Sequence, residues 1–233
     1  TFPSAVPVIE GWIKDLATAS QSNMPGSEGQ AGVVTSNNGE KAYLLSANGL
    51  DIPQLIEKGL MGSCFMHQAL QVYLGEDRMK VDNEEVEEGV GTAMQHHWDE
   101  AFGYLGVPKD FPSNTSSVFY WGDYTVSADA HFSCAQPLMD AFIKGRTAIN
   151  HKDYDTRDEQ IRIIRGTWER ICASQAIHYL NSTAEHIDDD AIRNHALSEG
   201  LAFVFSLRFN TLNTVSNEQI EDFLRWILKS CPD

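Results

Sequence analysis

The sequence predicts an all-α protein, a bundle of six to seven helices with a small β-hairpin near the N-terminus. Apolar residues recur at intervals of three and four over most of the 233 residues, which is the period of an amphipathic helix. Helix-capping residues precede several of these segments, and only one short region has the signals of a hairpin. With 42% hydrophobic residues the chain can bury a substantial core, so we expect a single helical-bundle domain over residues 1–233.

The N-terminal part of the chain combines one helix with the predicted hairpin. Apolar residues at helical spacing, following two prolines, predict an amphipathic helix over about residues 8–18. The apolar runs 32–34 and 42–45 flank Asn38-Gly39, a dipeptide that favours the tight turn of a β-hairpin. We therefore expect these two runs to pair as a small ribbon.

The rest of the chain is predicted to be helical. Asp51 caps a long helix that has Pro53 in its first turn and extends to about Leu74. An acidic loop, 82–88, precedes another helix, which Gly106 ends. Further helices are predicted over about residues 127–150, 156–180, 188–209 and 216–229.

Local signals refine this pattern at three places. Pro137 is expected to kink the helix that contains it. Ser216 and Gln219 have the spacing of a capping box at the start of the last helix. The connection 107–123 is long and contains the aromatic run Phe119-Tyr120-Trp121, so we expect it either to cover a site or to pack down through its aromatic rings.

Composition excludes some classes of function. The chain has 17 basic and 33 acidic residues, a formal net charge of −16. Binding to nucleic acid depends on lysine and arginine that neutralise phosphates, and no basic stripe is visible, so a nucleic-acid partner is not expected. No apolar run reaches the roughly 20 residues that span a bilayer.

The start of the chain bears on its processing, and the spacing of its cysteines bears on metal and redox sites. The chain begins at Thr1 without an initiator methionine, so we expect a fragment of a longer precursor. The four cysteines are scattered and form no Cys-x-x-Cys pair, which argues against a zinc ribbon or a thioredoxin-type centre. Cys64 and Cys172 lie among apolar residues and are expected to be buried free thiols.

A cluster of His and Glu residues is the main candidate for a functional site. His96 and His97 stand four and three residues before Glu100 in a helical run, and residues at these spacings share a helix face. Ninety-nine positions after His96, the sequence HALSEGLAF repeats the pattern with His195 and Glu199. Two helices that each present His and Glu could face one another across the core of a bundle.

Imidazole and carboxylate groups in this arrangement have two interpretations. They suit a transition-metal ion, here iron or zinc, with His97 and Glu100 as primary ligands and His96, His195 and Glu199 as further ligands or their supports. They also suit a buried polar network without metal. The His-Glu-x-x-His pattern of zinc proteases is absent from the sequence. On another predicted helix, Arg165 and Glu169 are expected to form an ion pair.

The motifs also resemble a known family. The runs EKGLMG (57–62), HHWDEAFGYLG (96–106), AIHYLN (176–181) and HALSEGLAFVFSLRFN (195–210) look like an uncharacterised bacterial family described only as a domain of unknown function. That family is similar to the imelysin-like proteins, helical bundles of the periplasm and outer membrane with a Gly-x-His-x-x-Glu motif proposed to bind metal. In this sequence the His and Glu of the motif fall on His97 and Glu100, whereas Gln95 replaces the glycine.

The resemblance implies an exported protein of the periplasm or cell surface, held to a membrane only by a lipid anchor outside this chain. Three functions then stay open. The first is binding of iron or zinc, in metal acquisition or surface display. The second is an imelysin-like metallopeptidase in which Glu100 activates a metal-bound water. The third is a non-catalytic surface assembly or binding module, which would self-associate or bind cell-surface proteins through the aromatic loop while its His/Glu pairs form a buried network.

Overall fold

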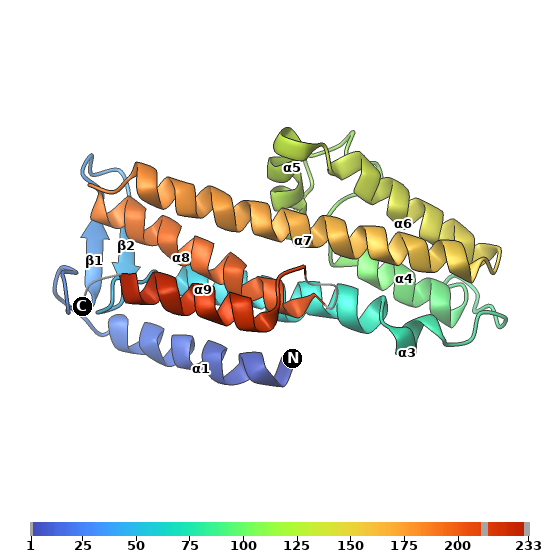
Figure 1. Ribbon diagram of the computed structural model, residues 1–233, viewed down its shortest axis with the longest axis horizontal. Coiled ribbons are helices and arrows are strands. Elements are labelled where there is room, and N and C mark those ends of the chain that lie inside the picture. The colour runs from blue at the N-terminus through green and yellow to red at the C-terminus, as the bar shows by residue number, and fades with distance from the viewer. Residues whose placement is uncertain (1, 211–213, 231–233) are drawn as a thin grey trace. The chain divides into compact units, whose positions relative to one another are not determined.

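The computed structural model describes residues 2–210 and 214–230 and is mainly helical (Figure 1). Helices make up 65% of it, and a two-stranded antiparallel hairpin lies near the N-terminus. The predicted all-α class with a small hairpin is therefore confirmed. Within the described residues, no helix is both long enough and apolar enough to cross a membrane.

The contacts along the chain divide it into two compact units. Unit 1 consists of Thr1–Gly62, Cys172–Arg208 and Val215–Asp233. Unit 2 consists of Ser63–Ile171 and Phe209–Thr214. The expectation of a single domain over residues 1–233 stays a prediction.

Unit 1 contains the hairpin and the helices near both ends of the chain. Asp51 accepts a hydrogen bond from the backbone N–H of Gln54 and so caps the helix after the hairpin, as predicted. The predicted capping box of the last helix is present, because Ser216 and Gln219 exchange side chain to backbone hydrogen bonds. The elements of unit 1 are α1 (Phe2–Ala19), β1 (Gly32–Thr35), β2 (Ala42–Leu45), α2 (Ile52–Leu60), α8 (Asp190–Ser206), α9 (Asn217–Ser230) and the part of α7 (Tyr154–Glu185) from Cys172 onward.

The hairpin forms where the turn dipeptide predicted it. β1 and β2 pair antiparallel, with Val33 opposite Leu44. Gly39 has φ +76°, a left-handed conformation that glycine adopts without the steric cost of a Cβ atom.

The core of unit 1 depends on the close approach of α2 and α8. Just after the end of α2, a Cβ atom placed on Gly62 would lie 2.2 Å from Ser206 Oγ of α8, so only glycine fits there. The ring of Trp12 packs on Gly59 and makes an edge-on contact with Phe205, with ring centroids 5.1 Å apart. These contacts hold α1, α2 and α8 together, and they position Lys58 and Glu199 on the facing helices.

Unit 2 is formed by the middle of the chain. The buried indole of Trp98 packs against Gly145 of helix α6 (Ala135–Asn150) and donates a hydrogen bond to the Phe142 carbonyl at 3.0 Å. This contact fixes the rotation of α4, on which the first His/Glu group lies. The helices of unit 2 are α3 (Glu76–Met79), α4 (Ala93–Gly103), α5 (Trp121–Phe132), α6 (Ala135–Asn150) and α7 up to Ile171.

The long helix predicted from Asp51 to Leu74 changes its geometry along its length. Only its first part, α2, is α-helical, and the segments Met61–Met66 and Gln68–Tyr73 are π-helical. The wider turn is seen in the bond from Leu74 N to Ala69 O at 3.0 Å, which spans five residues.

The predicted helix over residues 127–150 is wrong in one respect, because the chain breaks there rather than kinks. α5 ends at Phe132, and Ser133 has a left-handed backbone with φ +48°. Asp129 then accepts a hydrogen bond from the N–H of Ala135, which starts α6. Pro137 therefore lies in the first turn of a new helix, where its missing N–H costs no intrahelical hydrogen bond.

Candidate functional site

The first His/Glu group lies on α4 in unit 2. One carboxylate oxygen of Glu100 lies 3.1 Å from Nδ1 of His97 and 3.6 Å from Nε2 of His96. The His96 side chain is 49% exposed, that of Glu100 32% and that of His97 14%. The structure thus brings these three predicted residues together on a face that solvent reaches.

Gln95, which precedes His96 and His97, has a structural role at the start of α4. The Gln95 side chain accepts a hydrogen bond from the N–H of Thr92 at 3.0 Å, and the Thr92 hydroxyl accepts one from the N–H of Gln95 at 3.3 Å. This capping box satisfies two backbone donors at the start of α4. Gln95 therefore anchors the end of the helix that presents His97 and Glu100.

Two residues that sequence spacing did not indicate complete this group. The Tyr73 hydroxyl hydrogen-bonds to Glu100, and its ring centroid is 5.8 Å from that of His97. Burial, followed by the bond to Glu100, raises the pKa of Tyr73. Arg78 places its Nη1 atom 3.5 Å from Nε2 of His97. Both residues lie outside α4, so no periodicity within that helix could have revealed them.

The second His/Glu pair belongs to a different group, in unit 1. Nδ1 of His195 lies 2.8 Å from a carboxylate oxygen of Asp51, and Nε2 lies 3.4 Å from Glu199. The imidazole stacks on the ring of Tyr43, with centroids 4.0 Å apart and planes 13° from parallel. Both ring nitrogens of His195 therefore have carboxylate partners, one from the cap of α2 and one from α8.

Glu199 also faces a buried cation. Lys58 Nζ lies 3.5 Å from the other Glu199 oxygen, and both side chains are 7% exposed. Burial raises the pKa of Glu199, while Lys58, His195 and a hydrogen bond from Tyr179 act in the opposite direction. This charge balance is that of a buried, hydrogen-bonded network.

The five predicted metal ligands therefore divide between the two units. His96, His97 and Glu100 lie together in unit 2, and His195 and Glu199 lie together in unit 1. Across residues 2–210 and 214–230, no group of three or more His, Cys, Asp or Glu side chains is placed so that it could hold a metal ion. Metal binding and the choice between iron and zinc stay predictions.

Comparison with known protein families identifies the family of this chain. Residues 6–224 match one family over nearly the whole chain. The chain belongs to the family described as "Domain of unknown function (DUF4856)". The expected membership in a family of this kind is thus confirmed, while the likeness to imelysin-like proteins stays a prediction. No curated protein and no solved structure matches the chain.

The binding-module hypothesis needs the aromatic run Phe119-Tyr120-Trp121 to be exposed. In this member of the DUF4856 family only part of the run is exposed. Phe119 and Tyr120 are 61% and 51% exposed, but Trp121 is fully buried. The indole of Trp121 makes an edge-on contact with Trp168, with centroids 5.9 Å apart. Trp121 is therefore packed in the core of unit 2, whereas the rings of Phe119 and Tyr120 are exposed to solvent.

The predicted ion pair of Arg165 and Glu169 is wrong. Arg165 donates to the backbone carbonyls of Leu70 and Leu74, while Glu169 accepts hydrogen bonds from Asn210 and Thr214. Each side chain hydrogen-bonds to residues outside α7, and the ion pair within the helix does not form.

The cysteine expectation is met for Cys172 and only in part for Cys64. Within the described residues, Cys64, Cys134 and Cys172 form no disulfide; Cys172 is fully buried, whereas Cys64 is only half-buried. Cys231 lies outside the described residues.

Proposed function

We propose that this protein binds one transition-metal ion, iron or zinc, through His97 and Glu100, with His96 as the third ligand. The observation that carries the proposal is the convergence of two imidazole nitrogens on one Glu100 oxygen, at 3.1 and 3.6 Å. Imidazole nitrogen and carboxylate oxygen are a ligand set that both metals accept.

The spacing of these donors fits a small ion. Ligand atoms about 2.1 Å from a tetrahedral zinc ion are separated from each other by about 3.4 Å. The two measured separations lie on either side of this value. His96 is the most exposed of the three side chains and can turn to close the coordination sphere, and the Tyr73 hydroxyl beside Glu100 adds an oxygen donor.

We assign the His195 group a structural role instead. The ammonium of Lys58 is buried 3.5 Å from Glu199, so it would repel a metal ion there and cannot turn away. Arg78, which lies 3.5 Å from His97 in the other group, is exposed and can turn out into solvent. The same contacts tie the cap of α2 to α8 through Asp51 and His195. The chemistry of unit 1 is therefore that of a stabilising network, and the proposed metal site belongs to unit 2.

The location of the protein belongs to this proposal as well. The HHWDEAFGY run resembles an uncharacterised exported family that is in turn similar to imelysin-like proteins, and this supports export to the periplasm or cell surface and a role in metal acquisition or display. A metallopeptidase would need, in addition, a base that activates a metal-bound water. Glu100 is taken up as a ligand in the proposed site, which favours binding over hydrolysis.

The experiment is elemental analysis of the purified protein after incubation with iron(II) or zinc and gel filtration. We expect about one equivalent of metal in the wild type and a loss of most of it in His97→Ala. The matched control is His178→Ala, because His178 is an exposed histidine of unit 1. Equal metal content in the wild type and in His97→Ala would contradict the proposal.

A further inference from the structure

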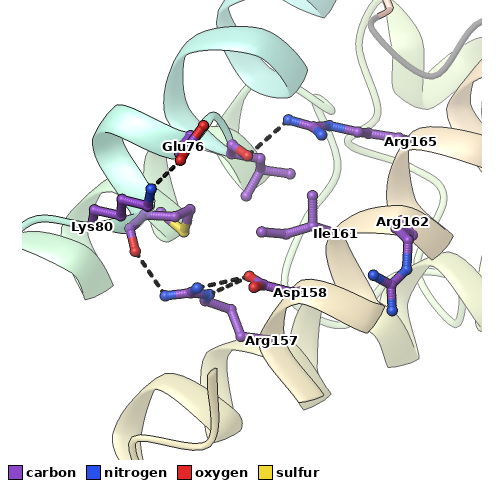
Figure 2. Close-up of a pocket in the computed structure, with 9 residues that line it drawn as sticks. Glu76, Lys80, Arg157, Asp158, Ile161, Arg162 and Arg165 are labelled. Carbon is purple, nitrogen blue, oxygen red and sulfur yellow. Dashed lines mark hydrogen bonds and ion pairs between the residues drawn. The ribbon is translucent and has the colours of Figure 1, made fainter. Parts of the chain in front are cut away.

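Unit 2 also contains a pocket, separate from the His/Glu group, that is lined by more cations than carboxylates. It is a pocket of about 300 Å³ between α3 and the first turns of α7 (Figure 2). Leu74, Met79 and Ile161 give it apolar walls. The remaining lining residues are charged, and cations outnumber carboxylates among them, although the whole chain has a formal net charge of −16.

The two carboxylates of the pocket already have partners. Glu76 pairs with Lys80, and Asp158 pairs with Arg157 at 2.7 Å, as Figure 2 shows. Arg157 also donates to the carbonyl of Met79 at 2.7 Å and is buried. Each pair is neutral by itself, so the pocket keeps an excess of positive charge on the other two arginines, which Asp158 offsets only in part at Arg165.

Arg165 is the better fixed of these two. Its Nε and Nη2 atoms donate to the carbonyl of Leu70 at 3.0 and 2.7 Å, and Nη2 also donates to that of Leu74 at 2.9 Å. Carbonyl dipoles orient the guanidinium but do not cancel its charge, and burial lowers the pKa of Arg165. Among the described residues, its Nη1 atom has no hydrogen-bond partner. A half-buried cation of this kind gains from a counter-ion.

Arg162 lies one helical turn before Arg165 on α7 and lines the same pocket. Its side chain is exposed and makes no hydrogen bond or ion pair with any part of the chain that the structure describes. Its guanidinium points away from that of Arg165 (Figure 2), and an anion in the pocket would draw this exposed side chain back over it. The planar fork of arginine matches carboxylate and phosphate oxygens well.

We propose that this pocket binds a small oxyanion, a carboxylate or phosphate group, which Arg162 and Arg165 hold against the apolar wall. The site is independent of the proposed metal site, since it shares none of its residues. Nonspecific attraction does not explain such binding, because the acidic chain as a whole repels anions.

The test is calorimetric titration of the full chain, freed of metal on a chelating resin, with three probes at constant ionic strength. Inorganic phosphate tests the phosphate source, acetate tests a bare carboxylate, and butyrate tests a carboxylate with an apolar tail. We expect saturable binding of phosphate or of a carboxylate, with butyrate tighter than acetate if a carboxylate is the ligand. Absence of saturable binding for all three probes would overturn the proposal.

Variants locate the site. Arg162→Gln should weaken binding by about tenfold or more, the factor that a charge-assisted hydrogen bond contributes. Arg170→Gln is the matched control, because it removes the same charge from the same helix outside the pocket and should leave affinity unchanged. Arg162 is exposed, so its replacement should leave the circular dichroism spectrum and melting temperature close to wild type. Equal weakening in both variants, or none in Arg162→Gln, would overturn the assignment.

Discussion

Lys58 and Glu199 form an ion pair at 3.5 Å inside unit 1, where each side chain is only 7% exposed. A buried pair of this kind is costly to break from one side, because the Glu199 carboxylate would stay buried without its cation and keep only His195 and Tyr179 as partners. Lys58→Met should therefore lower the free energy of unfolding by about 3 kcal/mol or more. Urea unfolding measures this, with Lys14→Met as a control at an exposed lysine. A loss below about 1 kcal/mol would mean that the pair is well hydrated.

Titration of Glu199 should make the free energy of unfolding depend on pH. Burial raises the pKa of its carboxyl, so the folded protein holds this proton more tightly than the unfolded chain. Its contribution to stability is then fully present below the unfolded pKa and is lost as pH rises through the folded pKa. The difference in unfolding free energy between the wild type and Glu199→Gln should thus shrink, or turn negative, from about pH 4.5 upward. A difference that grows with pH would show that Lys58, His195 and Tyr179 outweigh burial.

Gly145 makes room for the ring of Trp98. A Cβ atom at this position would lie 2.1 Å from the ring, which is itself fully buried. Gly145→Ala should destabilise the protein by about 1–3 kcal/mol, because the core cannot admit a further methyl group. Gly166→Ala is the control, since a Cβ there meets nothing within 4 Å on helix α7. That control should be neutral or stabilising by up to about 1 kcal/mol. Both values come from thermal or urea unfolding.

The thiol of Cys134 should be chemically inert in the folded protein. Burial raises its pKa to about 11, so little thiolate exists at pH 8. Brief iodoacetamide treatment of the native protein at this pH, followed by peptide mass mapping, should leave Cys134 unmodified. The same treatment in urea should modify it fully. Rapid modification under native conditions would show that the α5–α6 junction opens readily.

Local rules explain why much of the fold was predictable. Asn38-Gly39 produced the expected hairpin turn, and Asp51 and Ser216 cap the helices that follow them. These signals act within a few residues, so the sequence shows them directly. The break at Ser133 was missed because Asp129 reaches forward to start α6, a choice that helix periodicity does not reveal.

The candidate site was predictable only where one helix builds it. His96, His97 and Glu100 converge because residues at i,i+3 and i,i+4 share a face. Tyr73 joins them from a π-helical segment, and side-chain direction there does not follow the period of an α-helix. The partners of Arg165 were missed for a similar reason, since carbonyls of distant residues compete with the nearby carboxylate.

The most direct test of the metal-binding proposal is a calorimetric titration of zinc into metal-free wild type and Glu100→Gln. The wild type should bind one equivalent, with affinity that falls from pH 7.5 to pH 5 as protons compete for the imidazoles. Glu100→Gln keeps the shape of the side chain but removes the charge that His96 and His97 face. We expect it to bind at least about tenfold more weakly. Failure of the wild type to bind zinc or iron, or equal affinity in the variant, would contradict the proposal and leave Glu100 as part of a polar surface network.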